Sequence, residues 1–170
     1  MKILFIVGRK KTGKTTLIER LLSGLKARGY RLGSIKHTSH DHQFDREGSD
    51  SYRHARAGAE TTLLISPNTI ACFSVSLRKR KLDQLLDFLF RDCDLIIGEG
   101  FRESPYPKIE VLGTGADCAP SCALQDNLIA VVGKRKTELP VPHFTMDQVE
   151  EIIDFVEKKF PDRDADKEPL

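Results

Sequence analysis

Gly8-Arg9-Lys10-Lys11-Thr12-Gly13-Lys14-Thr15 is the part of this chain that says most about its fold. It has the spacing G-x-x-x-x-G-K-[ST], which is typical of a phosphate-binding loop, or P-loop. An apolar run at residues 3–7 precedes it, and residues 16–22 after it repeat apolar side chains at helical intervals. The pattern predicts a strand, a glycine-rich loop and a helix that bind the phosphates of a nucleotide.

The residue types in this loop suit phosphate chemistry. Glycines let backbone N–H groups approach an anion because they carry no Cβ, and the following helix directs its unpaired N–H donors at the same anion. Lys14 is expected to reach the terminal phosphates, and the Thr15 hydroxyl is placed to ligate Mg²⁺. The predicted nucleotide-binding residues of the loop are Gly8, Arg9, Lys10, Lys11, Thr12, Gly13, Lys14, Thr15 and Thr16.

A second apolar run, Asp94-Leu95-Ile96-Ile97-Gly98-Glu99-Gly100-Phe101, has the form of a Walker B strand. The acid at the end of such a strand holds Mg²⁺, often through water. The usual residue is Asp, and the longer Glu99 leaves direct ligation, outer-sphere ligation and a catalytic-water role open. We therefore expect Thr15 and Glu99 to bind the metal and Glu99 to be the catalytic residue.

Strand and helix patterns alternate along most of the chain, which favours the α/β class. The predicted fold is a P-loop NTPase with a mostly parallel β-sheet flanked by helices. Residues 61–66 and 69–75, separated by the turn signal Ser66-Pro67-Asn68, add an antiparallel hairpin or edge. The other expected elements are strands at 31–37, 108–112 and 127–132, and helices at 14–28, 49–57, 80–91 and 147–160.

Several apolar residues and cysteines are expected in the core. Cys72 and Cys93 lie in or beside apolar runs and are interpreted as small buried residues. Cys118 and Cys122 have the spacing C-x-x-x-C in a polar loop, which is a thin signal for a metal or redox site. The expected buried face of helix 80–91 comprises Leu82, Leu85, Leu86, Leu89 and Phe90.

The polar segment between residues 37 and 50 holds three of the five histidines of the chain. It follows the carboxyl end of a predicted strand, where open α/β sheets place their ligands. We interpret it as a functional loop. Metal binding, positioning of Mg²⁺-bound water and contact with a partner all remain open as its role.

Length and charge limit the classes of function. The 170 residues predict one P-loop nucleotide-binding domain over residues 1–160 and a disordered, charged tail over 161–170. A net charge of +2 is too small to indicate nucleic acid or an anionic membrane as the main partner. No apolar run approaches the ~18 residues of a membrane span, and the short run before the P-loop is unlike a signal peptide. We expect a cytoplasmic protein.

Taken together, the motifs resemble those of the MobB family, P-loop proteins of molybdenum cofactor biosynthesis. The resemblance covers about residues 2–160 and is most specific at Ile35-Lys36-His37-Thr38 and Glu99-Gly100-Phe101. The other matching motifs are Gly13-Lys14-Thr15-Thr16, His40-Asp41, Asp45, Gly48, Asp50-Ser51-Tyr52, Ala57-Gly58-Ala59, Asp94-Leu95-Ile96-Ile97 and Asp147-x-Val149-Glu150.

The resemblance implies a dimeric GTP-binding adaptor that assists the MobA guanylyltransferase in joining GMP to molybdopterin. Its cofactors would be GTP and Mg²⁺, and its GTP hydrolysis would be weak. By matching position, residues 13–16 would bind phosphates and Mg²⁺, and Glu99 would take the Walker B place. Lys36, His37, Asp45 and Asp50 would line the site or its dimer partner.

The chain departs from the family pattern at places that bear on base recognition. The family often has an Asp after the strand at 127–132, suited to pairing with guanine, where this chain has Gly133-Lys134-Arg135-Lys136. No Asn-Lys-x-Asp motif occurs, so a preference for GTP over ATP follows from the resemblance and not from these residues. A lysine is common where this chain has Ser49, and the Cys118–Cys122 pair lies outside the pattern.

Two other functions fit parts of the sequence. A P-loop kinase for a small metabolite could use Arg53 and Arg56 in a lid, although no clear lid is visible. A nucleotide-driven metal-insertion chaperone would take its ligands from His37, His40, His42, Cys118 and Cys122. Neither the dimer surface nor the contacts with the pterin can be predicted from the sequence.

Overall fold

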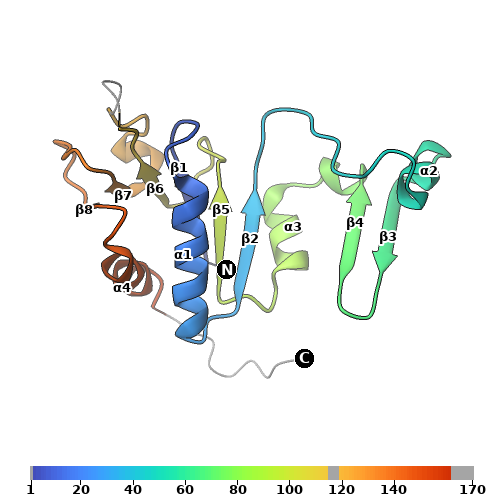
Figure 1. The fold of residues 1–170 in the computed structure, drawn as a ribbon, viewed down its shortest axis with the longest axis horizontal. Helices are drawn as coiled ribbons and strands as arrows, with labels where there is room; N and C mark the ends of the chain where they lie inside the picture. Colours follow the sequence, from blue (N-terminus) through green and yellow to red (C-terminus); the bar gives the residue numbers. More distant parts are fainter. Residues whose placement is uncertain (1, 115–118, 162–170) are drawn as a thin grey trace. The chain divides into compact units, whose positions relative to one another are not determined.

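The structure, a computed structural model, describes residues 2–114 and 119–161 (Figure 1). These residues form two compact units. The sheet unit comprises the described residues of 1–38 and 92–161, and the hairpin unit comprises residues 39–91. The predicted tail, apart from Pro161, lies outside the described residues, and so does Cys118.

The sheet unit is built on a six-stranded sheet in the order β2-β5-β1-β6-β7-β8, and all of its strand pairs are parallel. This arrangement agrees with the predicted P-loop NTPase class. Because β1 lies between β5 and β6, the loop that leaves β1 has neighbours on both sides. The strands are β1 (Ile3–Val7), β2 (Leu32–Lys36), β5 (Leu95–Glu99), β6 (Lys108–Val111), β7 (Leu128–Val132) and β8 (His143–Phe144).

Helices α1 (Lys14–Ala27) and α4 (Val149–Lys159) pack against each other and against this sheet (Figure 1). The apolar stripe predicted for α1 is correct, since Leu17, Ile18, Leu21 and Leu25 are buried and Leu22 is partly buried. Ile152, Ile153 and Val156 of α4 complete the core from the second helix. The P-loop therefore joins a fully buried strand to a helix held along one face.

Strand β8 was not predicted from the sequence. It contains only two residues, and its pairing with Val131 and Val132 of β7 extends the sheet by one parallel strand. Two residues are too few for a period-two pattern to stand out. A short 3₁₀ helix, η2 (Leu124–Asp126), lies before β7 and was also not predicted.

The hairpin unit contains α2 (Asp50–Arg56), β3 (Thr61–Ile65), β4 (Ile70–Ser74), the 3₁₀ helix η1 (Leu77–Lys79) and α3 (Leu82–Leu89). Strands β3 and β4 form an antiparallel sheet of their own, so the predicted hairpin is correct and is not an edge of the larger sheet. Ser49 begins α2 by accepting a hydrogen bond from Tyr52 N at 3.1 Å.

One face of this hairpin is apolar and exposed. In the register of the two strands, Leu63 pairs with Cys72 and Ile65 pairs with Ile70, so all four side chains share a face. All four are exposed, and Ile65 reaches 75 %. We call Leu63, Ile65, Ile70 and Cys72 the apolar face.

Three predictions of burial need correction. Cys72 is exposed, because its strand belongs to a two-stranded sheet with one uncovered face. Cys93 is only half-buried, at the turn before β5. In α3, Leu86 is fully buried but Leu89 is 55 % exposed, because the buried stripe of this eight-residue helix is narrower than the apolar pattern.

Among the helices that the structure describes, none is both long and apolar enough to cross a membrane.

Candidate functional site

The P-loop adopts a tight turn that ordinary side chains would disturb. Gly8, Lys11 and Gly13 all have positive φ, at 137°, 62° and 95°. A Cβ on Gly8 would lie 2.3 Å from the backbone oxygen of Val111 on β6, so only glycine fits there. No side chain caps the N-terminus of α1 at Gly13, which leaves its first N–H groups facing the loop.

Lys14 lies over this loop at the first position of α1. Its Nζ donates a hydrogen bond to Arg9 O at 2.6 Å, which holds the amine against the turn. Burial lowers the pKa of Lys14, and the charge of Glu99 acts against that shift. A cation that is partly removed from water at the centre of a P-loop is suited to meet a phosphate oxygen.

Two side chains contact the carboxylate of Glu99. Thr15 Oγ1 donates a hydrogen bond to Glu99 Oε2 at 3.0 Å, and Lys36 Nζ forms an ion pair with Glu99 Oε1 at 3.1 Å. The Glu99 side chain is only 16 % exposed, whereas that of Lys36 is 67 % exposed. The structure thus brings together Thr15 and Glu99, the two side chains predicted to bind the metal.

Strand register explains why these residues meet. Glu99 is the last residue of β5, where it pairs with Lys36 at the end of β2 and with Ile6 near the end of β1. Parallel strands bring their carboxyl ends to one edge of the sheet, and the P-loop leaves β1 at that edge. A cavity of about 360 Å³ opens there, lined by residues 10–16 and Glu99.

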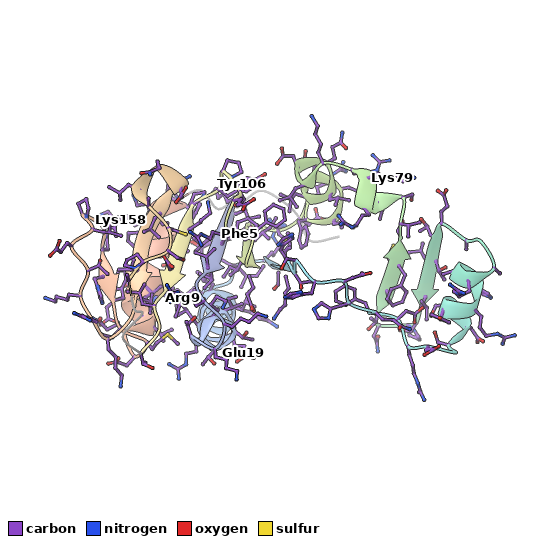
Figure 2. All side chains as sticks on the ribbon, turned by 90° about the horizontal axis from the view of Figure 1, so that it is seen from above. Phe5, Arg9, Glu19, Lys79, Tyr106 and Lys158 are labelled. Atoms are coloured by element: carbon purple, nitrogen blue, oxygen red, sulfur yellow. The ribbon has the colours of Figure 1, made fainter. Side chains whose placement is uncertain are left out.

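The segment after Glu99 is fixed by close packing. A Cβ on Gly98 would lie 2.1 Å from a ring carbon of Phe5, and one on Gly100 would lie 2.9 Å from His37 O. Aromatic rings pack beside the same segment. The Phe5 ring stacks on the Phe101 ring and is tilted against the Tyr106 ring, with 5.9 Å between the centroids of Phe5 and Tyr106 (both labelled in Figure 2). The backbone that carries Glu99 therefore has little freedom to move.

His37 belongs to this packed segment. Its N–H donates to Glu99 O at 2.9 Å, and its ring meets the Phe101 ring edge-on at 4.2 Å. These contacts place His37 beside the Walker B residue, at the edge of the sheet where the P-loop lies.

Asp45 and Asp50 belong to the hairpin unit, and neither is among the described residues that line the P-loop cavity. Asp45 Oδ1 accepts hydrogen bonds from the hydroxyls of Ser49 and Ser51 at 2.9 and 3.0 Å, so it supports the start of α2. Asp50 is exposed and pairs with Arg53 at 3.8 Å. Their proposed contact with the nucleotide stays a prediction.

The metal-chaperone alternative gains no support from the described residues, which contain no group of three His, Cys, Asp or Glu side chains that could hold a metal. Cys122 is buried, and its N–H donates to Glu110 Oε2 at 2.9 Å. Burial, together with the charge of Glu110, raises the pKa of the Cys122 thiol. A thiol with a raised pKa is poorly suited to ligate a metal or to attack a disulfide.

Two buried charges in β6 were missed from the sequence. Lys108 is fully buried, and its Nζ donates to the backbone oxygens of Ser104, Tyr106 and Asp126. Glu110 accepts from the backbone N–H and hydroxyl of Ser121. Charged residues at alternate positions of an otherwise apolar strand were the sequence signal that could have revealed these two side chains. In the structure, Lys108 and Glu110 hold the loops on either side of β6.

A P-loop between β1 and α1, with a carboxylate at the end of the neighbouring parallel strand, defines a protein of the P-loop NTPase class. Comparison with known families narrows this class. The family model of MobB, molybdopterin guanine dinucleotide synthesis protein B, matches residues 3–134, and the chain belongs to this family.

Relatives and solved structures agree with this assignment. The molybdopterin-guanine dinucleotide biosynthesis adapter protein of Escherichia coli K12 is 38 % identical over 151 residues, which cover 85 % of each chain. The protein of the same name from Haemophilus influenzae is 33 % identical over 91 % of this chain and 87 % of its own. A crystal structure of Bacillus subtilis MobB superposes with a TM-score of 0.74 at 29 % identity, over 94 % of this chain and 98 % of that one.

Proposed function

We propose that this protein is an adapter in the biosynthesis of molybdopterin guanine dinucleotide, and that it works by binding Mg²⁺-GTP in the P-loop cavity. The observation that carries the proposal is the convergence of Lys14, Thr15 and Glu99 at one edge of the sheet. The names of the relatives support the pathway. The same proposal places the protein in the cytoplasm.

The residues of the cavity fit Mg²⁺. A threonine hydroxyl and a carboxylate 3.0 Å apart are hard oxygen donors, the type that Mg²⁺ prefers. Mg²⁺ bound there would neutralise charge on the β- and γ-phosphates. Thr15 and Glu99 would hold the ion directly or through water, Lys14 would contact the terminal phosphates, and backbone N–H groups of residues 8–16 would surround the chain of phosphates.

Hydrolysis in such a site would be slow. Glu99 could orient a water near the γ-phosphate, but one of its carboxylate oxygens is already paired with Lys36. None of the described residues that line the cavity is an arginine. A slow cycle suits an adapter, because the bound nucleotide then persists long enough to alter a surface offered to a partner.

The proposed partners are a guanylyltransferase of the MobA type, molybdopterin and a second copy of this chain. The apolar face of the hairpin unit supports the dimer: Leu63, Ile65 and Ile70 are each more than half exposed. An isolated two-stranded sheet is marginally stable, and adjoining exposed apolar side chains mark interaction surfaces. In a symmetric dimer, the apolar face of each copy would cover the apolar face of the other.

Calorimetric titration with GTP and with ATP, each with Mg²⁺, tests the nucleotide site. The wild-type protein should bind GTP more tightly, and Lys14→Ala should reduce binding by about 100-fold or more, because a charge-assisted contact to phosphate is lost. Unchanged binding by Lys14→Ala would refute the site. Equal binding of ATP would refute the guanine preference but leave the P-loop in place.

A pull-down with a purified MobA-type guanylyltransferase tests the adapter role. The nucleotide-loaded protein should retain this partner better than the nucleotide-free protein or Lys14→Ala. Retention that is independent of both nucleotide and Lys14 would separate adapter function from the P-loop and contradict the proposed coupling.

A further inference from the structure

The chain contains no Asn-Lys-x-Asp motif, so any recognition of guanine must come from elsewhere. The position of the phosphates limits where the base can lie. Thr15 and Glu99 mark the Mg²⁺ end of the cavity, which faces β5. Mg²⁺ held there would lie at the β- and γ-phosphates, so the nucleoside would extend to the other side of the P-loop, towards β6 and β7.

The loops on that side approach the P-loop. A Cβ on Gly113, just after β6, would lie 3.8 Å from Thr12 Cγ2, and a Cβ on Gly13 would lie 3.4 Å from Met146 Cε, just after β8. Strand β7 runs between β6 and β8, so the loop after β7 emerges between these two contacts.

The loop after β7 lines a second cavity of about 420 Å³. Its described lining consists of residues 135–139 of that loop together with Ala119 and Pro120 of the segment after β6. Its volume lies within the range of about 300–1,000 Å³ that is usual for small-molecule sites. The cavity belongs entirely to the sheet unit.

The lining carries the groups that guanine requires. Among the described residues, the exposed carboxylate of Glu138 has no hydrogen-bond or ion-pair partner, and Arg135 and Lys136 line the same cavity. The buried hydroxyl of Thr137 also finds no partner in the part of the chain that the structure describes. Guanine presents N1–H and N2–H₂ donors beside the O6 and N7 acceptors, which match a carboxylate beside a cation.

We propose that this cavity binds the guanine base and that Glu138 is its specificity-determining residue, accepting hydrogen bonds from N1–H and N2–H₂. Lys136 or Arg135 donates to O6. The inference rests on the proposed binding of GTP in the P-loop.

The arrangement also rejects adenine. Adenine has an unprotonated N1 and no amino group at C2, so its edge would place a lone pair against the Glu138 carboxylate. Its exocyclic amino group would face the cations that suit O6. A carboxylate left without a partner makes adenine the weaker ligand, whatever the phosphates contribute.

The test is calorimetric titration of the full chain with the Mg²⁺ complexes of GTP, ATP and XTP. Glu138→Gln should weaken GTP binding by about tenfold or more, since one bidentate contact contributes about 1–3 kcal/mol of discrimination. The same variant should bind XTP more tightly than the wild type does, because a glutamine amide can donate to the oxygen at C2 of xanthine. This gain cannot come from misfolding.

Glu151→Gln is the matched control, because Glu151 is an exposed carboxylate on α4 that lines neither cavity. It should leave all three affinities unchanged. The rival acceptor is Asp147, an exposed carboxylate after β8 that follows Met146. If Asp147→Asn shifts the preference from GTP to XTP and Glu138→Gln does not, the assignment of Glu138 is wrong.

Failure of this inference differs from failure of the proposed function. If the wild type prefers GTP and Glu138→Gln keeps that preference, Glu138 does not read the base, while the P-loop site stands. If no nucleotide binds in a manner that depends on Lys14, the proposed function itself fails, and the inference fails with it.

Discussion

At the residue scale, Glu99 is held between a hydroxyl and a cation. Thr15 donates to one carboxylate oxygen and Lys36 pairs with the other, so the side chain has one orientation before any ligand arrives. Such pre-positioning reduces the side-chain entropy that is lost when a nucleotide binds. Substitutions at this position are therefore expected to affect nucleotide binding and hydrolysis to different extents.

Glu99→Gln should slow single-turnover GTP hydrolysis by about 100-fold, because a neutral amide can neither polarise the attacking water nor attract Mg²⁺ as strongly. The nucleotide affinity should fall by much less, since Lys14 and the backbone N–H groups remain. Glu103→Gln, which changes an exposed carboxylate after the same strand, is the control. Equal losses of hydrolysis and affinity would mean that Glu99 has only a structural role.

Glycine substitutions should separate a backbone clash from a side-chain clash. Gly8→Ala should destabilise the fold by about 1–3 kcal/mol, because its Cβ would meet Val111 O at 2.3 Å and its φ is 137°. Gly24→Ala is the control, since its Cβ would meet only the movable end of Ile153 and alanine favours the helix. Urea denaturation measures both. A larger loss for Gly24→Ala would contradict this explanation of the loop.

At the element scale, two buried side chains of β6 form hydrogen bonds that hold the loops on either side of the strand. Lys108 holds the segment before the strand through three backbone oxygens, and Glu110 holds the segment after it through Ser121 and Cys122. Strand β6 also lies beside the P-loop strand. Changes in these buried charges should therefore reach the edge of the sheet that carries the P-loop cavity.

Lys108→Met should lower the free energy of unfolding by about 2–4 kcal/mol, because several buried carbonyls lose their donor. Lys2→Met is the matched control: Lys2 Nζ is buried and makes no hydrogen bond within the described residues, so its removal should be neutral or stabilising. Urea denaturation of both variants at one pH checks this order. A greater loss for Lys2→Met would contradict it.

The effect of Lys108 should also depend on pH. Burial lowers the pKa of Lys108 below its ordinary 10.5, so the unfolded chain binds more protons than the folded protein in that interval. The contribution of Lys108 to the free energy of unfolding therefore rises as the pH increases from the folded-state pKa towards 10.5. The stability difference between wild type and Lys108→Met should widen over that range, and a difference that narrows would show that the proton is held more tightly in the folded state.

At the scale of the whole molecule, the sheet unit and the hairpin unit have different surfaces. The sheet unit contains every residue that lines the two cavities, whereas the hairpin unit carries the apolar face. Our proposals thus place nucleotide binding and self-association in separate parts of the chain. Substitutions in one unit should leave the function of the other measurable.

Ile65→Glu should weaken dimerisation by about tenfold or more, because it places an unpaired charge in the apolar face. Phe88→Glu is the control, since Phe88 of α3 has the same 75 % exposure and lies outside that face. Sedimentation analysis over a range of concentrations gives both dissociation constants. Should Phe88→Glu dissociate the protein and Ile65→Glu leave it intact, the dimer surface would be elsewhere.

Local patterns were enough to predict the P-loop motif, its flanking strand and helix, the strand that ends at Glu99, the hairpin and the terminal helix. In each case a short motif or a hydrophobic period carries the information, because the relevant contacts lie within a few residues along the chain. The predicted stripe of α1 is an example, since a helix places every third or fourth residue on one face.

Other features depended on contacts between distant residues. The strand order, the short β8, the meeting of Lys36 with Glu99, the exposure of Cys72 and the buried charges of β6 all arise where separate segments pair or fail to cover one another. The cavity beside Glu138 is of the same kind, because loops from two strands enclose it. Sequence patterns describe which face of an element is apolar, but only packing decides what that face meets.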